Sequence, residues 1–386
     1  MSSFNIGNSP LLLACRCNRK KIFNLLLKNY AEINCVNKNG MNGLIVAAMH
    51  NSVDVLADLI KLTDEMDCRQ FDHQDINGDT ALIMACKNSN GVIINMLLAC
   101  PLNFDIHNKN GDTAFTSLCK STQDIKSIEL LVAKSDINVV NNCGDSGLLI
   151  AARRDDYALM KLLIEQGQAN VNIQNNDKET ALIVACEREN IKIVKYLMLH
   201  GADPNLQNSI GFTGLLHACQ RNQTKIAKLL LSNNANPNLQ NAAGYTALVW
   251  ASIKQNIELV TDLLNHSANP NIPVSNNSRY TALTWAVINN SNMIIKKLLD
   301  HDADPYLETN DGKTSFDYLN ASNKSEIVGY YDRICRWNRR KSFILFLVCY
   351  DYMPLKKNSM VAVESRRKYE DVLSNIHLVQ IICTFL

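Results

Sequence analysis

The chain has 386 residues, of which 47% are hydrophobic and 20% charged, and its formal net charge is +2. A single compact core rarely grows to this length, so two domains or an elongated array are expected. The apolar content excludes disorder over most of the chain. The near-neutral charge gives no overall reason for attraction to nucleic acid or to a membrane, and no apolar run is long enough for a transmembrane helix.

The cysteines give information about the compartment. There are 13 of them, an odd number, and no pair has Cys-x-x-Cys spacing. This excludes a disulfide framework and a zinc-ribbon pattern, and free thiols are typical of a reducing compartment. We therefore expect a cytoplasmic protein, with the nucleus as a second possible location.

One pattern recurs along residues 1–325 at a nearly constant period. In each unit a Ser, Thr or Asn, named the anchor here, occupies the same position. The anchors are Ser9, Asn42, Thr80, Thr113, Ser146, Thr180, Thr213, Thr246, Thr281 and Thr314. Successive anchors are 33 to 35 residues apart, except for a step of 38 between Asn42 and Thr80. The sequence therefore contains nine fairly complete repeats and a partial tenth.

Within each unit the residue types follow one order. Most units have a Gly two residues before the anchor, where a tight turn needs positive φ. Small residues follow five and six positions after the anchor, and a second apolar stretch has helical spacing, as in Ile193, Val194 and Leu197. A Gly-Ala-Asp-Pro-Asn ending such as Gly201–Asn205 then stops the helix. The order is turn, helix, turn, helix, loop.

This pattern resembles the ankyrin repeat, which it matches in period, Gly, Thr-x-Leu and Ala-Asp-Pro-Asn ending. The resemblance implies an all-α solenoid of about ten helix-turn-helix repeats over residues 1–325, with residues 326–386 as a basic, helical C-terminal extension or cap. The family usually has Thr-Pro-Leu-His where this chain has Thr-Ala-Leu-Ile and relatives. Losing the Pro and His is expected to cost some rigidity and a hydrogen-bond network at the helix start.

Two longer steps mark inserted residues, near Lys61–Phe71 and near Pro273–Arg279. Insertions in repeat arrays fall in loops, so both are expected to be surface loops. Five cysteines share the small-residue position six after the anchor and are predicted to fill the core; they are Cys15, Cys86, Cys119, Cys186 and Cys219. Trp250 and Trp285, four after the anchor, are interpreted as packing residues.

Catalytic motifs are missing from the sequence. It contains no Gly-x-Gly-x-x-Gly, P-loop, His-Glu-x-x-His or Gly-x-Ser-x-Gly, and its 8 histidines share no spacing. We expect no enzyme activity, no cofactor, no metal and no small-molecule substrate.

The resemblance implies a partner-binding concave face, made by the turn tips and the first helix of each repeat. One residue before the anchor, four successive repeats carry acids, and the next three carry Phe212, Tyr245 and Tyr280. With Ile210 beside them, these rings are predicted to form an exposed aromatic row that binds a protein partner. The alternative is that each ring covers the tip of the adjacent turn.

Cations stand seven or eight residues after the anchor in six successive repeats. The candidate partner-binding cations are Lys87, Lys120, Arg154, Arg188, Arg221 and Lys254. They favour an acidic or amphipathic partner segment, or else they form a solvated face or pair with the acidic tips. Nucleic acid is not expected as a partner, because residues 1–329 are net acidic.

After Ser325 the pattern stops, and helices are predicted at Trp337–Leu347, which would cap the array, and near Asp371–Leu386. This tail resembles those of uncharacterised ankyrin proteins from protists and algae. Its last helix also resembles the start of an F-box helix without the Leu-Pro opening. Two functions follow: a protein-binding scaffold, or alternatively a substrate adaptor of a ubiquitin ligase.

Overall fold

The computed structural model of the chain describes residues 9–66, 68–121, 125–275, 278–320 and 324–336. These residues form consecutive helix pairs and contain no strand, only an isolated bridge between Val140 and Ser146. The first helices of the pairs are α1 (Pro10–Arg16), α3 (Gly43–Met49), α5 (Ala81–Lys87), α7 (Ala114–Ser121), α9 (Gly147–Arg153), α11 (Ala181–Glu187), α13 (Gly214–Gln220), α15 (Ala247–Ile253) and α17 (Ala282–Ile288). The second helices are α2 (Lys20–Lys28), α4 (Val53–Met66), α6 (Gly91–Leu98), α8 (Ile125–Val132), α10 (Tyr157–Glu165), α12 (Ile191–Leu199), α14 (Thr224–Leu231), α16 (Ile257–Asn265) and α18 (Asn292–Asp300).

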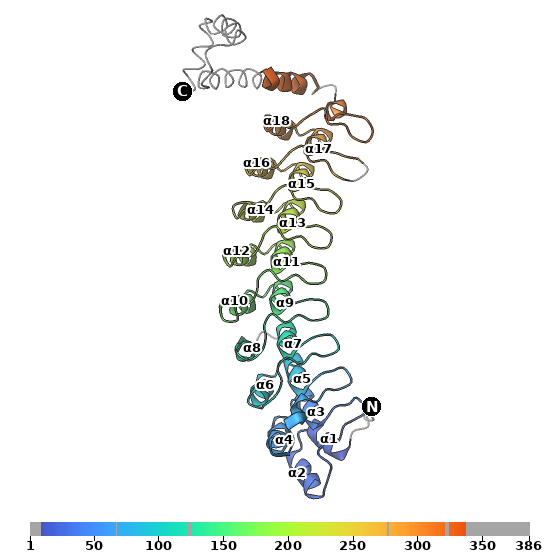
Figure 1. The fold of residues 1–386 in the computed structure, drawn as a ribbon, viewed down its shortest axis with the longest axis vertical. Coiled ribbons are helices and arrows are strands. Elements are labelled where there is room, and N and C mark those ends of the chain that lie inside the picture. The colour runs from blue at the N-terminus through green and yellow to red at the C-terminus, as the bar shows by residue number, and fades with distance from the viewer. Residues whose placement is uncertain (1–8, 67, 122–124, 276–277, 321–323, 337–386) are drawn as a thin grey trace, which may run out of the picture.

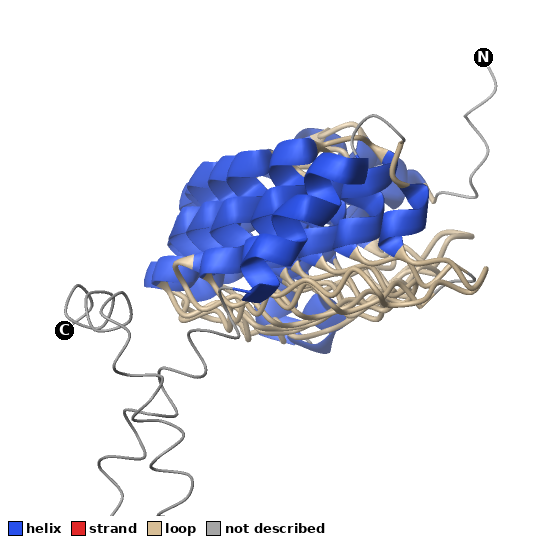
Figure 2. Ribbon diagram, turned by 90° about the horizontal axis from the view of Figure 1, so that it is seen from above, coloured by secondary structure: helices blue, strands red, loops and turns tan. Residues whose placement is uncertain are grey.

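The pairs stack into an elongated array with the N-terminal helices at one end (Figure 1). First helices form one column, second helices form another, and the connecting loops project together from one side of the helices (Figure 2). Each first helix packs on the first helices of its neighbours. This arrangement confirms the predicted all-α array of paired repeats. In the described part of the chain, no helix is both long and apolar enough to span a membrane.

The anchors start the first helices by capping them. The side chain of Thr80 accepts a hydrogen bond from the backbone N–H of Ile83 at 3.2 Å, and Thr180 does the same for Ile183. Such an N-cap satisfies a backbone donor that has no partner inside the helix. Because every complete repeat has a capping residue here, the helices begin in register although the Pro of the family pattern is missing.

From the second repeat onward, the residue two positions before the anchor has a left-handed backbone. Gly244 has φ of 82°, and a Cβ there would lie 2.0 Å from the backbone nitrogen of Ser275 in the next repeat. Only glycine allows adjacent turns to approach this closely. In the sixth and ninth repeats, Lys178 and Arg279 replace glycine at this position and still have a left-handed backbone, with φ of 56° and 52°.

The core runs without interruption along the array. All five cysteines at the small-residue position are buried, which confirms their predicted place. Burial raises the pKa of the Cys15 and Cys119 thiols to about 12. Trp250 and Trp285 pack against this core but remain partly exposed.

The first inserted segment corrects the prediction of a surface loop. Residues of the Lys61–Phe71 insertion extend α4 and then form the 3-10 helix η1 (Cys68–Asp72), where Phe71 is only 2% exposed. Burying an apolar ring stabilises the folded chain more than exposing it in a loop would. The described residues of the second insertion, near Pro273–Arg279, form a loop as predicted.

The tenth repeat is reduced. Its first helix is the 3-10 helix η2 (Ser315–Tyr318), and residues 324–336 form a helix that covers the ninth repeat. Ile327 is fully buried there, and the Tyr330 hydroxyl donates to Asp300 at 2.7 Å. The expected domain boundary after residue 325 lies within this helix. The helices predicted at Trp337–Leu347 and Asp371–Leu386 lie outside the described residues.

Candidate functional site

The candidate site is the surface formed by the turns and the first helices, called the inner face here. Three positions in each repeat define it. The tip residue comes one before the anchor, the floor residue four after it, and the cation position seven or eight after it. Because the first helices pack side by side, each position forms a column along the array.

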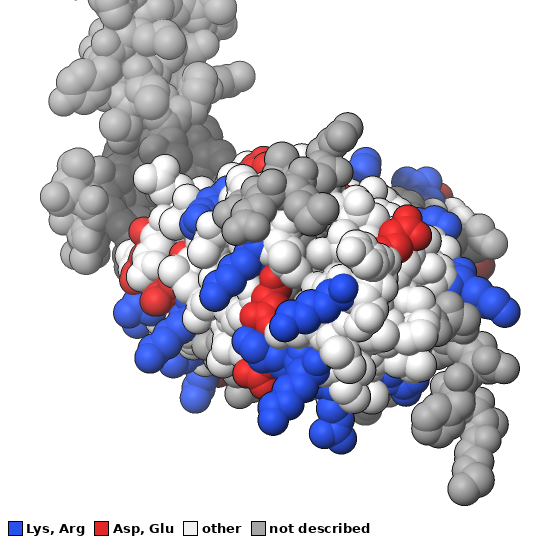
Figure 3. Space-filling view, turned by 90° about the horizontal axis from the view of Figure 1, so that it is seen from below, with Lys and Arg blue, Asp and Glu red and all other residues white. Residues whose placement is uncertain are grey.

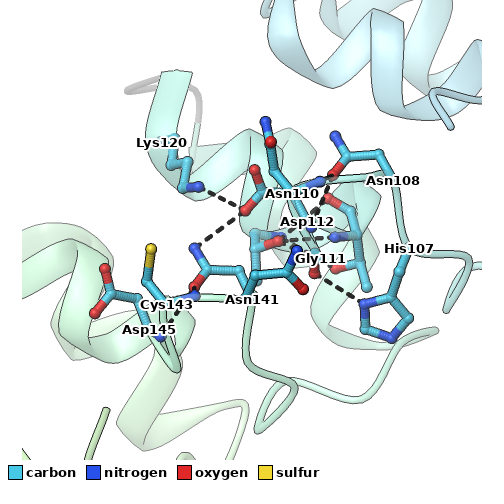
Figure 4. A network of polar contacts seen from close by, with 12 residues as sticks. His107, Asn108, Asn110, Gly111, Asp112, Lys120, Asn141, Cys143 and Asp145 are labelled. Carbon is cyan, nitrogen blue, oxygen red and sulfur yellow. Dashed lines mark hydrogen bonds and ion pairs between the residues drawn. The ribbon is translucent and has the colours of Figure 1, made fainter. Parts of the chain in front are cut away.

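In the third to sixth repeats the tip acids are paired with cations, and Figure 4 shows the pair in the fourth repeat. Lys87 lies 2.6 Å from Asp79, and Lys120 lies 2.5 Å from Asp112. In the fifth repeat Arg153 lies 3.5 Å from Asp145 and also 2.6 Å from Glu179 of the sixth repeat. The charges of this half of the inner face are therefore largely compensated within the protein.

Asparagines of the next turn complete this network. Asn108 donates its side-chain amide to Asp79 at 2.8 Å, and Asn141 donates to Asp112 at 3.2 Å. The two aspartates are buried, with exposed fractions of 2% and 4%. A buried carboxylate must be hydrogen-bonded and paired to remain charged, so the acidic tips hold successive turns together.

These contacts favour the structural alternative for part of the cation column. Lys87 and Lys120 pair with the acidic tips of their own repeats, and Arg154 donates to the backbone carbonyl of Cys119 at 2.7 Å. That these three side chains bind a partner stays a prediction.

In the seventh to ninth repeats the same positions are aromatic. Phe212 packs against His217 with ring centroids 4.6 Å apart and the rings tilted by 34°, and Tyr245 stacks on Trp250 at 4.7 Å. Tyr280 contacts Trp285 edge to face at 5.6 Å. Each tip ring thus packs on the floor residue of its own repeat.

The predicted exposed row of three rings is wrong for Phe212, which is only 8% exposed. Its side chain folds back onto His217 instead of pointing outward. Tyr245 and Tyr280 are partly exposed, and Ile210 is 55% exposed beside the tip.

Three cations border the aromatic half. Arg188, Arg221 and Lys254 are all exposed. Arg221 lies 3.4 Å from Glu187, but both groups are largely solvated, so this pair is weak. Arg188 and Lys254 form no ion pair within the described part of the chain. This half of the inner face therefore keeps positive charge available.

The floor column is aromatic in more repeats than the two predicted packing residues indicate. His217, Trp250, Trp285 and Tyr318 occupy it in four successive repeats, and the Tyr280 and Tyr318 rings are 5.8 Å apart. The hydrogen bond with Tyr318 raises the pKa of Tyr280 to about 12. The sequence signal for this column is an aromatic residue four positions after each of four successive anchors, whereas the prediction covers only Trp250 and Trp285, as packing residues.

Apart from the cations of the inner face, a basic surface lies at the N-terminal end of the array (Figure 3). It includes the exposed side chains of Arg19, Lys21 and Lys28. Lys20 pairs there with Asp58 at 2.8 Å. Across the described residues, no cluster of His, Cys, Asp or Glu could hold a metal ion.

Comparison with protein families gives a consistent result along the array. A model described as ankyrin repeats (3 copies) matches residues 44–141, 117–208, 197–274 and 215–309. A model described as ankyrin repeat matches residues 6–38. The matches cover more than half of the chain. No curated protein matches it.

Proposed function

The chain belongs to the ankyrin-repeat family, and on that premise we propose that it is a non-catalytic scaffold that binds a partner protein through its inner face. Ankyrin repeats commonly mediate protein–protein interactions, and the matched models describe repeats rather than a catalytic domain. We place the partner on the sixth to ninth repeats.

The observation that carries this proposal is the contrast between the two halves of the inner face. In the third to sixth repeats the four tip acids are paired with Lys87, Lys120 and Arg153. In the seventh to ninth repeats the partly exposed rings of Tyr245 and Tyr280 lie in columns bordered by Arg188, Arg221 and Lys254. Tyr, Trp and Arg are the residues that most often dominate binding energy at protein interfaces.

The same contrast defines the chemistry of the partner. An acidic, amphipathic segment would place its apolar residues against Tyr245, Tyr280 and Ile210. Its carboxylates would meet Arg188, Arg221 and Lys254. Electrostatic complementarity of this kind speeds association and selects among partners.

Affinity purification with the full chain tests the proposal. Tyr245→Ala and Tyr280→Ala should each weaken partner binding by about 1–3 kcal/mol. Reversing the charge of Arg188 and Lys254 should mainly slow association and reduce its salt dependence. Val92→Ala, at a 57% exposed site on α6, is the control and should change nothing. Partner capture unaffected by both Tyr variants would contradict the proposal.

The adaptor alternative depends on the tail, which lies outside the described residues. The same purification with and without residues 330–386 tests it, because ubiquitin-ligase components recovered only with the tail would favour an adaptor.

A further inference from the structure

We propose that the segment bound by the aromatic half of the inner face is an acidic polyproline II helix, with prolines and carboxylates repeating every third residue. This inference rests on the proposed function, which it narrows from a protein partner to one backbone conformation and one side-chain pattern. Its basis is the floor and tip residues of the eighth and ninth repeats.

The first step is register. Each repeat presents one aromatic pair, and neighbouring packed helices lie about 8–10 Å apart. A polyproline II helix has three residues per turn and rises about 9 Å per turn, so one side of it meets one pair in each repeat. Two turns of an α-helix span about 11 Å. Register therefore fits a polyproline II helix well but does not exclude an α-helix.

The second step is the hydrogen-bond donors. The indole nitrogens of Trp250 and Trp285 are buried and have no acceptor within the described part of the chain. Unpaired buried donors are rare in folded proteins, and these two recur at the same position of successive repeats. Rotation of each partly exposed indole would bring its N–H to a bound backbone. A polyproline II helix leaves its carbonyls free, whereas an α-helix uses them internally. The donors therefore favour polyproline II.

The third step is the apolar contact. Proline has no backbone N–H, so its ring can lie against an aromatic ring without leaving a donor unpaired. Tyr245 and Trp250 are nearly parallel, with 23° between their planes. Tyr280 packs edge to face between Trp285 and Tyr318. Each of these two repeats thus offers an aromatic pair against which a proline ring can pack.

The last step is charge and length. Arg188, Arg221 and Lys254 stand eight residues after the anchors of the sixth, seventh and eighth repeats, giving one cation per repeat along one edge that ends beside the aromatic pair of the eighth repeat. Carboxylates at every third residue of the segment would face them. The aromatic columns are limited at one end by the buried Phe212. At the other end Lys313 lies over the Tyr318 ring, 5.5 Å from its centroid.

The test uses the full chain and three labelled 15-residue peptides of equal charge, measured by fluorescence anisotropy. The first has five Pro-Pro-Glu repeats. The second has the same composition with its five Glu clustered at one end. The third is a helix-forming peptide of Ala, Leu and five Glu. The periodic proline peptide should bind at least ten-fold more tightly than either of the others.

Two variants separate the contribution of the indole N–H donors from that of aromatic ring contact. Trp250→Phe and Trp285→Phe keep an aromatic ring but remove the N–H donor, and each should weaken binding of the periodic proline peptide at least five-fold. Val92→Ala on the opposite side should bind it like the parent. Circular dichroism and urea unfolding of each variant show whether the array remains folded.

Other outcomes overturn the inference in distinguishable ways. If the helical peptide binds as tightly as the periodic one and loses affinity in Tyr245→Ala, the inner face is a binding site but not for polyproline II. If no peptide binds while Tyr245→Ala still abolishes capture of a partner protein, the inference also fails and the proposed function stands. If capture is insensitive to both Tyr245→Ala and Tyr280→Ala, the proposed function fails and this inference fails with it.

Discussion

Replacing Asp112 with Ala is expected to destabilise the fourth and fifth repeats without changing the fold. Asp112 is 4% exposed and accepts hydrogen bonds from Lys120 at 2.5 Å and from Asn141 at 3.2 Å (Figure 4). The side chain of Asn141 is held in place, because its amide oxygen Oδ1 accepts hydrogen bonds from the backbone N–H groups of Cys143 and Asp145. It cannot turn outward to find water when the carboxylate is removed.

The magnitude follows from what each partner loses. The amide of Asn141, in a residue 7% exposed, is left without its acceptor, which costs about 1–3 kcal/mol. The ion pair adds about 0.5–1 kcal/mol, because the Lys120 side chain is 41% exposed and solvent screens it. The free energy of unfolding should therefore fall by about 1.5–4 kcal/mol. Glu129→Ala, at an exposed acid on α8, should change it by less than about 0.5 kcal/mol.

Urea unfolding followed by circular dichroism measures the total loss, and amide hydrogen exchange shows where it occurs. Repeats contact only their neighbours, so destabilisation should be local. Exchange should speed up in α7 and α9 before α15 and α17. If Asp112→Ala and Glu129→Ala unfold at the same urea concentration, Asp112 is not a structural acid and the tip acids become candidates for partner binding.

Three further predictions concern the core, one titrating group and the turns. Buried Cys186 should react with iodoacetamide at least 100-fold more slowly than exposed Cys143, as measured by mass spectrometry, and equal rates would show that the small-residue position is open. Burial lowers the pKa of His217 below 6.5, so the unfolded chain binds more protons there and stability should fall as pH drops through about 6.5. Urea midpoints at pH 7.5 and 5.5 should therefore differ more for the parent than for His217→Gln, and equal differences would refute this. Gly201→Ala should cost about 1–2 kcal/mol for its left-handed backbone alone, whereas Gly244→Ala should cost at least twice as much because its Cβ would clash with the next turn; equal urea midpoints would contradict the clash.

The fold could be predicted from sequence because each repeat contains the same local residue pattern for a turn followed by a helix. A capping residue such as Thr80, a glycine two residues earlier and a small residue such as Cys86 recur in phase. These features act within a few residues of each other, and their repetition along the chain makes the period visible. The structure of the inserted segment before Thr80 could not be predicted in this way, because a single insertion has no second copy to compare and burial of Phe71 decides its structure.

Tertiary structure decided which side chains of the inner face are available to a partner, and the residue columns alone do not show this. The sequence placed Asp79 and Lys87 on the inner face and left open whether they meet each other or a partner. Likewise, it placed Phe212, Tyr245 and Tyr280 in one column without showing where each ring points. Side-chain direction decides both questions, because a tip residue can extend outward or fold back onto the helix it precedes. The sequence by itself determined which residues share the inner face; only the packing of each tip on its own helix decided which of them remain available to a partner.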